Sequence, residues 1–110
     1  MAELTDQQKE MVFQFQTYQQ QMQSILIQKE SLRLQLMEID KAVEELNTTN
    51  QEKAYKITGN IMISKPVADL KKELAENKEA IDVRIKSLEK TEERITARLK
   101  ELQEKLKEIA

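Results

Sequence analysis

A stretch of alternating apolar and polar residues lies in the middle of the chain and reads Ala54-Tyr55-Lys56-Ile57-Thr58-Gly59-Asn60-Ile61-Met62-Ile63-Ser64. Apolar and polar residues alternate on both sides of Gly59-Asn60, as they do in half-buried β-strands. A Gly-Asn pair makes a tight two-residue turn when Gly takes the first central position. The stretch therefore predicts a β-hairpin over residues 54–64. We expect four of its apolar side chains to share one face, namely Tyr55, Ile57, Ile61 and Ile63.

Two uninterrupted heptad series flank this stretch and predict two long helices, over residues 5–47 and 65–110. With its apolar residues seven apart, each helix has one narrow stripe to bury against a partner helix. The heptad positions are Leu4, Met11, Tyr18, Ile25, Leu32, Ile39 and Leu46 in the first helix, and Leu74, Ile81, Leu88, Ile95, Leu102 and Ile109 in the second.

Both predicted helices begin at residues that favour a helix start. In Thr5-Asp6-Gln7-Gln8, the Thr hydroxyl and the Gln8 side chain can each satisfy an unpaired backbone amide, which is a capping box. For the second helix we expect Ser64 or Lys65 as the cap. Pro66 would then lie in the first turn, where its missing N–H costs nothing.

Folding the chain so that Leu46 faces Leu74 pairs the two helices in antiparallel orientation. Each helix also has a second core series, which is Gln8, Phe15, Met22, Lys29, Leu36 and Val43 in the first helix and Lys78, Ile85, Glu92, Leu99 and Leu106 in the second. In this register Val43 faces Lys78, and Lys29 meets the acidic residue Glu92. A slip of one heptad would leave either charge buried without a partner. We therefore interpret Lys29 and Glu92 as a register pair. The alternative is that both side chains extend to water and never meet.

The sequence thus predicts a mainly α chain forming a single domain over residues 1–110. Its architecture is a long antiparallel two-helix coiled coil with a central β-hairpin. An isolated hairpin is marginally stable in water and leaves both of its edges unpaired. We therefore expect this hairpin to contact other subunits; the alternative is a disordered connector. The expected oligomerisation residues are Tyr55, Ile57, Gly59, Ile61 and Ile63.

The composition argues against several classes of function. The chain has no His and no Cys, so it lacks the usual zinc ligands, the commonest general base and any thiol nucleophile. Its single Gly excludes the glycine-rich loops that bind nucleotide phosphates. We expect no catalytic site, no metal and no cofactor. With 35% charged residues and this periodicity, the chain belongs with coiled coils and long helices.

Charge and targeting signals indicate a cytoplasmic protein without nucleic-acid or membrane partners. Residues 1–50 carry 8 acids and 4 bases, and residues 67–110 carry 11 of each, so there is no basic stripe. The start of the chain is acidic and polar, where a signal peptide would be basic and then apolar. No apolar run approaches the roughly 18 residues of a membrane-spanning helix.

Three segments of the chain resemble a prefoldin β subunit, most closely the archaeal type. They are Phe15-Gln16-Thr17-Tyr18-Gln19-Gln20-Gln21, Tyr55-Lys56-Ile57-Thr58-Gly59-Asn60-Ile61-Met62-Ile63 and Leu88-Glu89-Lys90-Thr91-Glu92-Glu93-Arg94. The resemblance implies a hexamer of two α and four β subunits, whose hairpins join into β-barrels. It also implies an ATP-independent chaperone that holds unfolded proteins at its coil tips and passes them to a group II chaperonin.

The resemblance places client contacts near the free ends of the helices. The residues themselves support a binding surface there, because residues 11–28 carry no charge. Val12, Phe13, Leu26 and Ile27 lie outside the heptad series, which is more apolar surface than a two-helix seam buries. The alternative is that they widen the coil's own core or pack on a neighbouring coil. The candidate client-binding residues are Met11, Val12, Phe13, Phe15, Tyr18, Leu102, Leu106 and Ile109.

Two other functions compete with the chaperone interpretation. A purely structural coiled-coil scaffold or tether would need charged tips without excess apolar surface, and the end of the second helix fits that description. A nucleic-acid-binding helical arm would need clustered Lys and Arg, which this chain lacks. The uncharged apolar end of the first helix favours the client-holding function over both.

Overall fold

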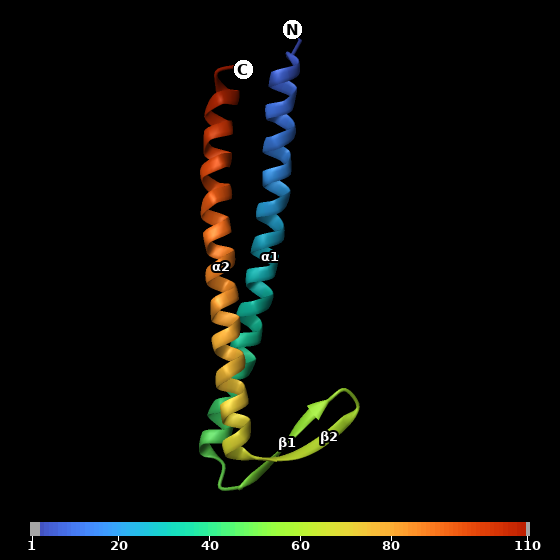
Figure 1. The fold of residues 1–110 in the computed structure, drawn as a ribbon, viewed down its shortest axis with the longest axis vertical. Coiled ribbons are helices and arrows are strands. Elements are labelled where there is room, and N and C mark those ends of the chain that lie inside the picture. The colour runs from blue at the N-terminus through green and yellow to red at the C-terminus, as the bar shows by residue number, and fades with distance from the viewer. Residues whose placement is uncertain (1–2, 110) are drawn as a thin grey trace. The chain divides into compact units, whose positions relative to one another are not determined.

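The computed structural model describes residues 3–109, and these are mainly helical. The elements follow the order α1 (Asp6–Thr48), β1 (Lys53–Thr58), β2 (Ile61–Pro66) and α2 (Val67–Lys107) (Figure 1). The prediction of two long helices with a central antiparallel β-hairpin is confirmed. The described residues group into two compact units. Unit 1 contains those up to Glu30 and from Lys86 onward, and unit 2 contains Ser31–Ile85. That the chain is one domain stays a prediction.

In unit 1, segments of α1 and α2 pack in antiparallel orientation along the predicted heptad positions. Ile25, Ile95 and Leu102 are buried between them. At the start of α1, the Thr5 amide donates to Gln8 Oε1 at 2.8 Å and the Gln8 amide donates to Thr5 Oγ1 at 3.1 Å. The predicted capping box is therefore present, and it satisfies backbone donors that the helix leaves free.

The charged layer of unit 1 joins the two helices directly. Lys29 Nζ donates to Glu92 Oε2 at 2.7 Å and lies 3.9 Å from Glu89 Oε2. The Lys29 side chain is only 8% exposed, against 26% for Glu92. The two side chains therefore meet inside the seam and do not both extend to water. A buried lysine without this partner would be strongly destabilising, because its charge would lose water without compensation.

Unit 2 contains the rest of both helices and the hairpin. Leu32, Val67, Leu70 and Ile81 are buried there. Val67 and Leu70 were not among the predicted heptad positions. Their spacing is nevertheless helical, because Val67 lies three residues before Leu70 and Leu70 lies four residues before Leu74. They extend the core of unit 2 to the first turn of α2.

One predicted seam position of unit 2 is wrong. Lys78 was expected to face Val43 in the seam, but in the structure Lys78 is exposed to solvent. Its Nζ donates to Asp40 Oδ1 at 2.8 Å, and this contact raises the pKa of Lys78. The ammonium group keeps its hydration by leaving the seam, and a carboxylate on the neighbouring helix is within reach of its long side chain.

The start of α2 also differs from the prediction. Ser64, Lys65 and Pro66 belong to β2, so neither Ser64 nor Lys65 caps the helix and Pro66 lies outside its first turn. The hairpin ladder continues to the pair between Lys53 and Pro66. Residues 64–66 therefore pair with β1 and do not form the first turn of the helix. The Val67 amide donates to the carbonyl of Glu52 at 2.8 Å. One of the free amides of the new helix is therefore satisfied from across the hairpin root.

We predict that replacing Glu92 with Ala lowers the free energy of unfolding by roughly 2 kcal/mol, because Lys29 then stays in the seam with only a distant carboxylate. Chemical denaturation followed by circular dichroism, at fixed protein concentration, measures the loss. Glu89→Ala is the control, since Glu89 is exposed and lies farther from Lys29 Nζ, and its cost should stay below about 0.5 kcal/mol. Equal losses in the two variants would contradict a specific role for Glu92.

Candidate functional site

The hairpin in unit 2 is closed by the turn Gly59-Asn60, and Thr58 pairs directly with Ile61 (Figure 1). Gly59 has a φ of 60°, and no other described residue has a positive φ. A positive φ at this position is typical of a two-residue hairpin turn with Gly at the first central position. A residue with a side chain would be strained in this backbone conformation. The predicted turn is therefore confirmed.

The apolar side chains of the hairpin lie on both of its faces, so the expectation that four of them share one face is wrong. Residues paired directly across an antiparallel ladder point to the same face. Because the turn contains two residues, each odd-numbered position of β1 pairs with an even-numbered position of β2. One face therefore presents Tyr55, Ile57 and Met62, and the other presents Ile61 and Ile63.

All five of these apolar side chains are exposed, from 42% at Ile63 to 72% at Ile57. The sheet formed by the described residues has only two strands, so each strand has one edge without a ladder partner. Exposed apolar surface next to unpaired strand edges is typical of an interaction site. Met62 was missing from the predicted oligomerisation residues, and counting pairs through the two-residue turn would have placed it beside Ile57.

A cluster of three charges attaches the hairpin to α2. Glu73 Oε1 accepts from Lys65 Nζ of β2 at 2.9 Å, and Lys56 Nζ of β1 lies 3.5 Å from both Glu73 oxygens. The hydrogen bond from Lys65, followed by the charges of Lys56 and Lys65, lowers the pKa of Glu73 although partial burial opposes the shift. One helical carboxylate thus holds both strands, and it does so on the face that also carries Ile61 and Ile63.

A hollow of about 350 Å³ lies where the hairpin joins the helices of unit 2. Leu46 of α1, Leu70 and Leu74 of α2, and Tyr55 of β1 line it, and the lining is mostly apolar. The exposed apolar surface of the hairpin therefore continues onto the helices at its root. A partner that covers the hairpin would find further apolar contacts there.

The predicted client-binding residues all belong to unit 1, but their exposure differs. The prediction of Leu102 as a client contact is wrong, because Leu102 is only 4% exposed. Its heptad position directs the side chain into the seam, where a client has no access. Phe13 is 64% exposed. The other predicted residues are half-buried along the edges of the seam: Met11, Val12, Phe15, Tyr18, Leu106 and Ile109.

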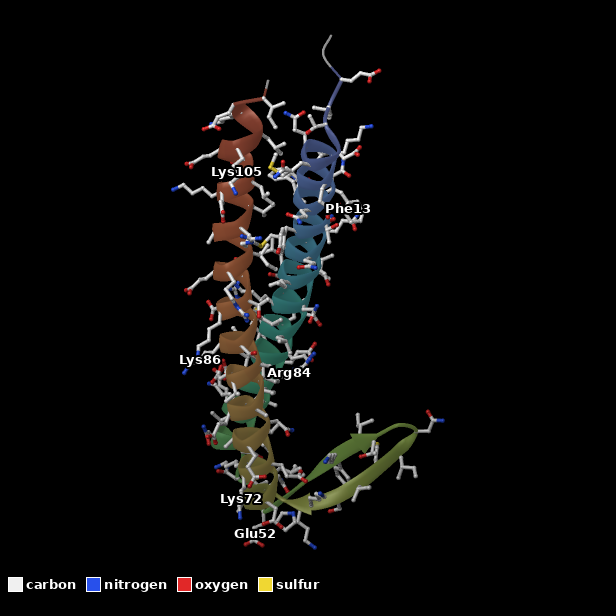
Figure 2. The ribbon with its side chains drawn as sticks, turned by 45° about the horizontal axis from the view of Figure 1, so that its top comes forward. Phe13, Glu52, Lys72, Arg84, Lys86 and Lys105 are labelled. Carbon is white, nitrogen blue, oxygen red and sulfur yellow. The ribbon has the colours of Figure 1, made fainter. Side chains whose placement is uncertain are left out.

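Most of the exposed apolar side chains of unit 1 lie on α1, and Leu4 lies just before that helix. Phe13, Leu26 and Ile27 are exposed, and Figure 2 shows Phe13 on the side of α1 that faces away from α2. These residues lie within the uncharged range 11–28, with glutamines between them. Apolar side chains among neutral polar ones can contact an unfolded segment without requiring a matching charge pattern. We refer to this exposed set (Phe13, Leu26 and Ile27) as the tip surface.

Three further exposed apolar residues, all in unit 2, were not among the predicted site residues. They are Leu34 and Met37 on α1 and Val83 on α2, each more than half exposed. Like Leu26, they fall outside the two heptad series of their helices, and this was the signal that could have identified them.

The part of the chain that the structure describes contains no group of three His, Cys, Asp or Glu residues arranged to bind a metal ion. Neither of its two helices is long and apolar enough to cross a membrane. Within the same range, every buried polar side-chain atom has a hydrogen-bond partner.

Comparison with known proteins points to one family. Residues 9–110 match the sequence profile of the family described as prefoldin subunit. The chain is 37% identical to the prefoldin subunit beta of Archaeoglobus fulgidus, and the match covers 99% of this chain and 95% of that protein. It is 34% identical to the prefoldin subunit beta of Thermococcus onnurineus, with 96% and 92% covered.

The structural comparison agrees. The crystal structure of the prefoldin beta subunit from Thermococcus strain KS-1 matches this chain with a TM-score of 0.87 at 30% sequence identity. The match covers 99% of this chain and 96% of that chain. Sequence and fold therefore agree over nearly the full length of each protein.

The charge cluster at the hairpin predicts a pH dependence. Because the folded-state pKa of Glu73 lies below its ordinary value of 4.5, its contribution to stability is present above that value and is lost as the pH falls through the lowered pKa. Titration of the Glu73 carboxyl by carbon NMR should show the lowered pKa. Lys65→Met should raise it toward 4.5 by more than Lys56→Met does, since Lys65 makes the shorter contact. Equal effects of the two variants would count against the cluster as described.

Proposed function

The chain belongs to the prefoldin family of chaperone subunits, as a β-type member, and we propose that it holds unfolded proteins at the free ends of its coiled coil without ATP and delivers them to a group II chaperonin. The observation that carries this proposal is a hairpin with apolar side chains exposed on both faces, in a chain that matches prefoldin β subunits over nearly its whole length.

The hairpin is proposed to assemble the chain with other subunits. Supporting this are its two unpaired edges, its five exposed apolar side chains and the apolar hollow at its root. Burial of apolar surface stabilises by about 25 cal/mol per Å², so covering several exposed Ile, Met and Tyr side chains supplies a substantial driving force. The proposed assembly is a hexamer of two α-type and four β-type subunits, in which the hairpins form β-barrels.

The tip surface is proposed to contact clients. Phe13, Leu26 and Ile27 are exposed on a helix segment without charge, and the half-buried Met11 and Met22 lie on the same segment. Methionine side chains are flexible and adapt to different apolar partners. Weak contacts of this kind from several subunits add up, because one bound segment raises the effective concentration of the others. A cytoplasmic location is part of the proposal, since unfolded chains and the chaperonin meet there.

We predict that Ile61→Asp abolishes assembly with a prefoldin α-type subunit, because the variant would bury an unpaired charge in the proposed barrel. Light scattering on a sizing column measures the assembly. Asn60→Asp is the matched control: it adds the same charge in the turn, where water remains available, and should assemble normally. A hexameric Ile61→Asp protein would overturn the assembly role of the hairpin.

We predict that Phe13→Ser assembles normally but binds an unfolded client about fivefold more weakly, since partial burial of one Phe side chain is worth ~1 kcal/mol. Suppression of aggregation of a denatured protein without nucleotide measures the holding. Leu34→Ser is the control, because Leu34 is an exposed apolar residue of α1 outside the tip surface. Equal losses would contradict a tip site. An assembled wild type without any effect on aggregation would favour a structural scaffold instead.

A further inference from the structure

Two hollows in unit 1 lie between α1 and α2, and they differ in charge. The first, which we call the Tyr18 groove, has a volume of about 500 Å³ and is lined by Tyr18, Gln21, Ile95, Ala97, Arg94 and Arg98, together with Thr91. Its lining contains two arginines and no acid. The second hollow has a volume of about 470 Å³, and its lining contains three acids, Glu89, Glu92 and Glu93. Two lysines in the same lining, Lys29 and Lys100, partly neutralise these acids.

The Tyr18 groove combines apolar and cationic groups in one place. Tyr18 and Gln21 come from the uncharged range of α1, so the charged residues in the lining of the groove are the two arginines of α2. The half-buried Tyr18 and the exposed Ala97 supply the accessible apolar surface, and the buried Ile95 lies beneath them. An incoming apolar side chain can therefore be partly buried while a neighbouring group remains within reach of a guanidinium.

The two arginines differ in how far they are already engaged. The guanidinium carbon of Arg98 lies 6.0 Å from the centre of the Tyr18 ring, and its Nη1 donates to Glu101 Oε2 at 3.2 Å. Arg94 makes no ion pair with any residue in the described range 3–109. Arg94 is therefore the arginine that is available to a carboxylate from outside, and Arg98 keeps the tyrosine face covered by positive charge.

We propose that the Tyr18 groove gives this subunit a preference among clients, for unfolded segments in which an apolar side chain lies next to an acidic residue. This inference rests on the proposed client-holding function. The apolar side chain occupies the space over Tyr18 and Ala97, and the carboxylate pairs with Arg94. Opposite charge on the two sides of the contact favours such segments, and a basic segment is disfavoured by repulsion from the same arginines.

The test uses three fluorescent peptides with one shared apolar core, flanked by Asp, Ser or Lys. Anisotropy measures their binding to the assembled heteromer at low and at high salt. We expect the Asp-flanked peptide to bind about fivefold more tightly than the Lys-flanked one at low salt, with the Ser-flanked peptide between them. The difference should shrink at high salt, since exposed ion pairs are screened.

Arg94→Gln should remove most of the preference for the acidic flank, because it weakens binding of the Asp-flanked peptide more than binding of the Ser-flanked one. Among residues 3–109, Arg94 makes no ion pair or cation–π contact that the substitution would remove. Lys100→Gln is the matched control, because it removes the same charge from the acid-containing hollow. It should leave the preference intact, and the thermal unfolding of both variants should match that of the wild type.

The outcomes separate the two proposals. If no peptide binds to the assembled wild type, the client-holding function itself fails. If all three bind equally, the function stands and the charge preference is overturned. If Lys100→Gln removes the preference as strongly as Arg94→Gln does, the net charge of the coil is responsible, and the assignment to the Tyr18 groove is wrong.

Discussion

Two packed helices bury only one narrow stripe on each helix, and every other apolar side chain stays in contact with water. In this protein that stripe is filled by the heptad residues, such as Ile25 and Ile95 in unit 1 and Leu32 and Ile81 in unit 2. The apolar residues outside it gather at the hairpin and along α1. Because a seam of this kind has no room for them, their burial depends on other chains, and this links the fold to a function in assembly and client holding.

Charged groups in this structure position the elements more than they stabilise them. Lys29 meets Glu92 inside the seam, and a buried pair of this kind gives little net stability but makes a shifted register costly. Glu73 performs a similar task at the hairpin, where it contacts one lysine from each strand. Arg94 in the Tyr18 groove differs from both, because it has no ion-pair partner among residues 3–109.

Much of the fold was predictable because it depends on local periodicity. The heptad series located the seam, Thr5 and Gln8 marked the start of α1, and Gly59-Asn60 identified the turn. The expected layer of Lys29 and Glu92 followed from the same periodicity. The candidate sites were less predictable: Leu102 was placed among the client contacts by its nearness to the end of the chain, although its heptad position already directed it into the seam.

The identity and order of the elements follow from local sequence, since helix and strand periods, capping residues and turn residues act over a few positions along the chain. The two-residue turn also implied that Ile61 and Ile63 lie on the opposite face from Tyr55 and Ile57. The extent of pairing between separate segments became evident only from their packing in three dimensions. The hairpin ladder extends to Pro66 and so delays the start of α2, and Lys78 leaves the seam to reach Asp40 on the other helix. Both outcomes depend on how separate segments pair, and pairing is a competition between distant contacts that a local pattern does not record.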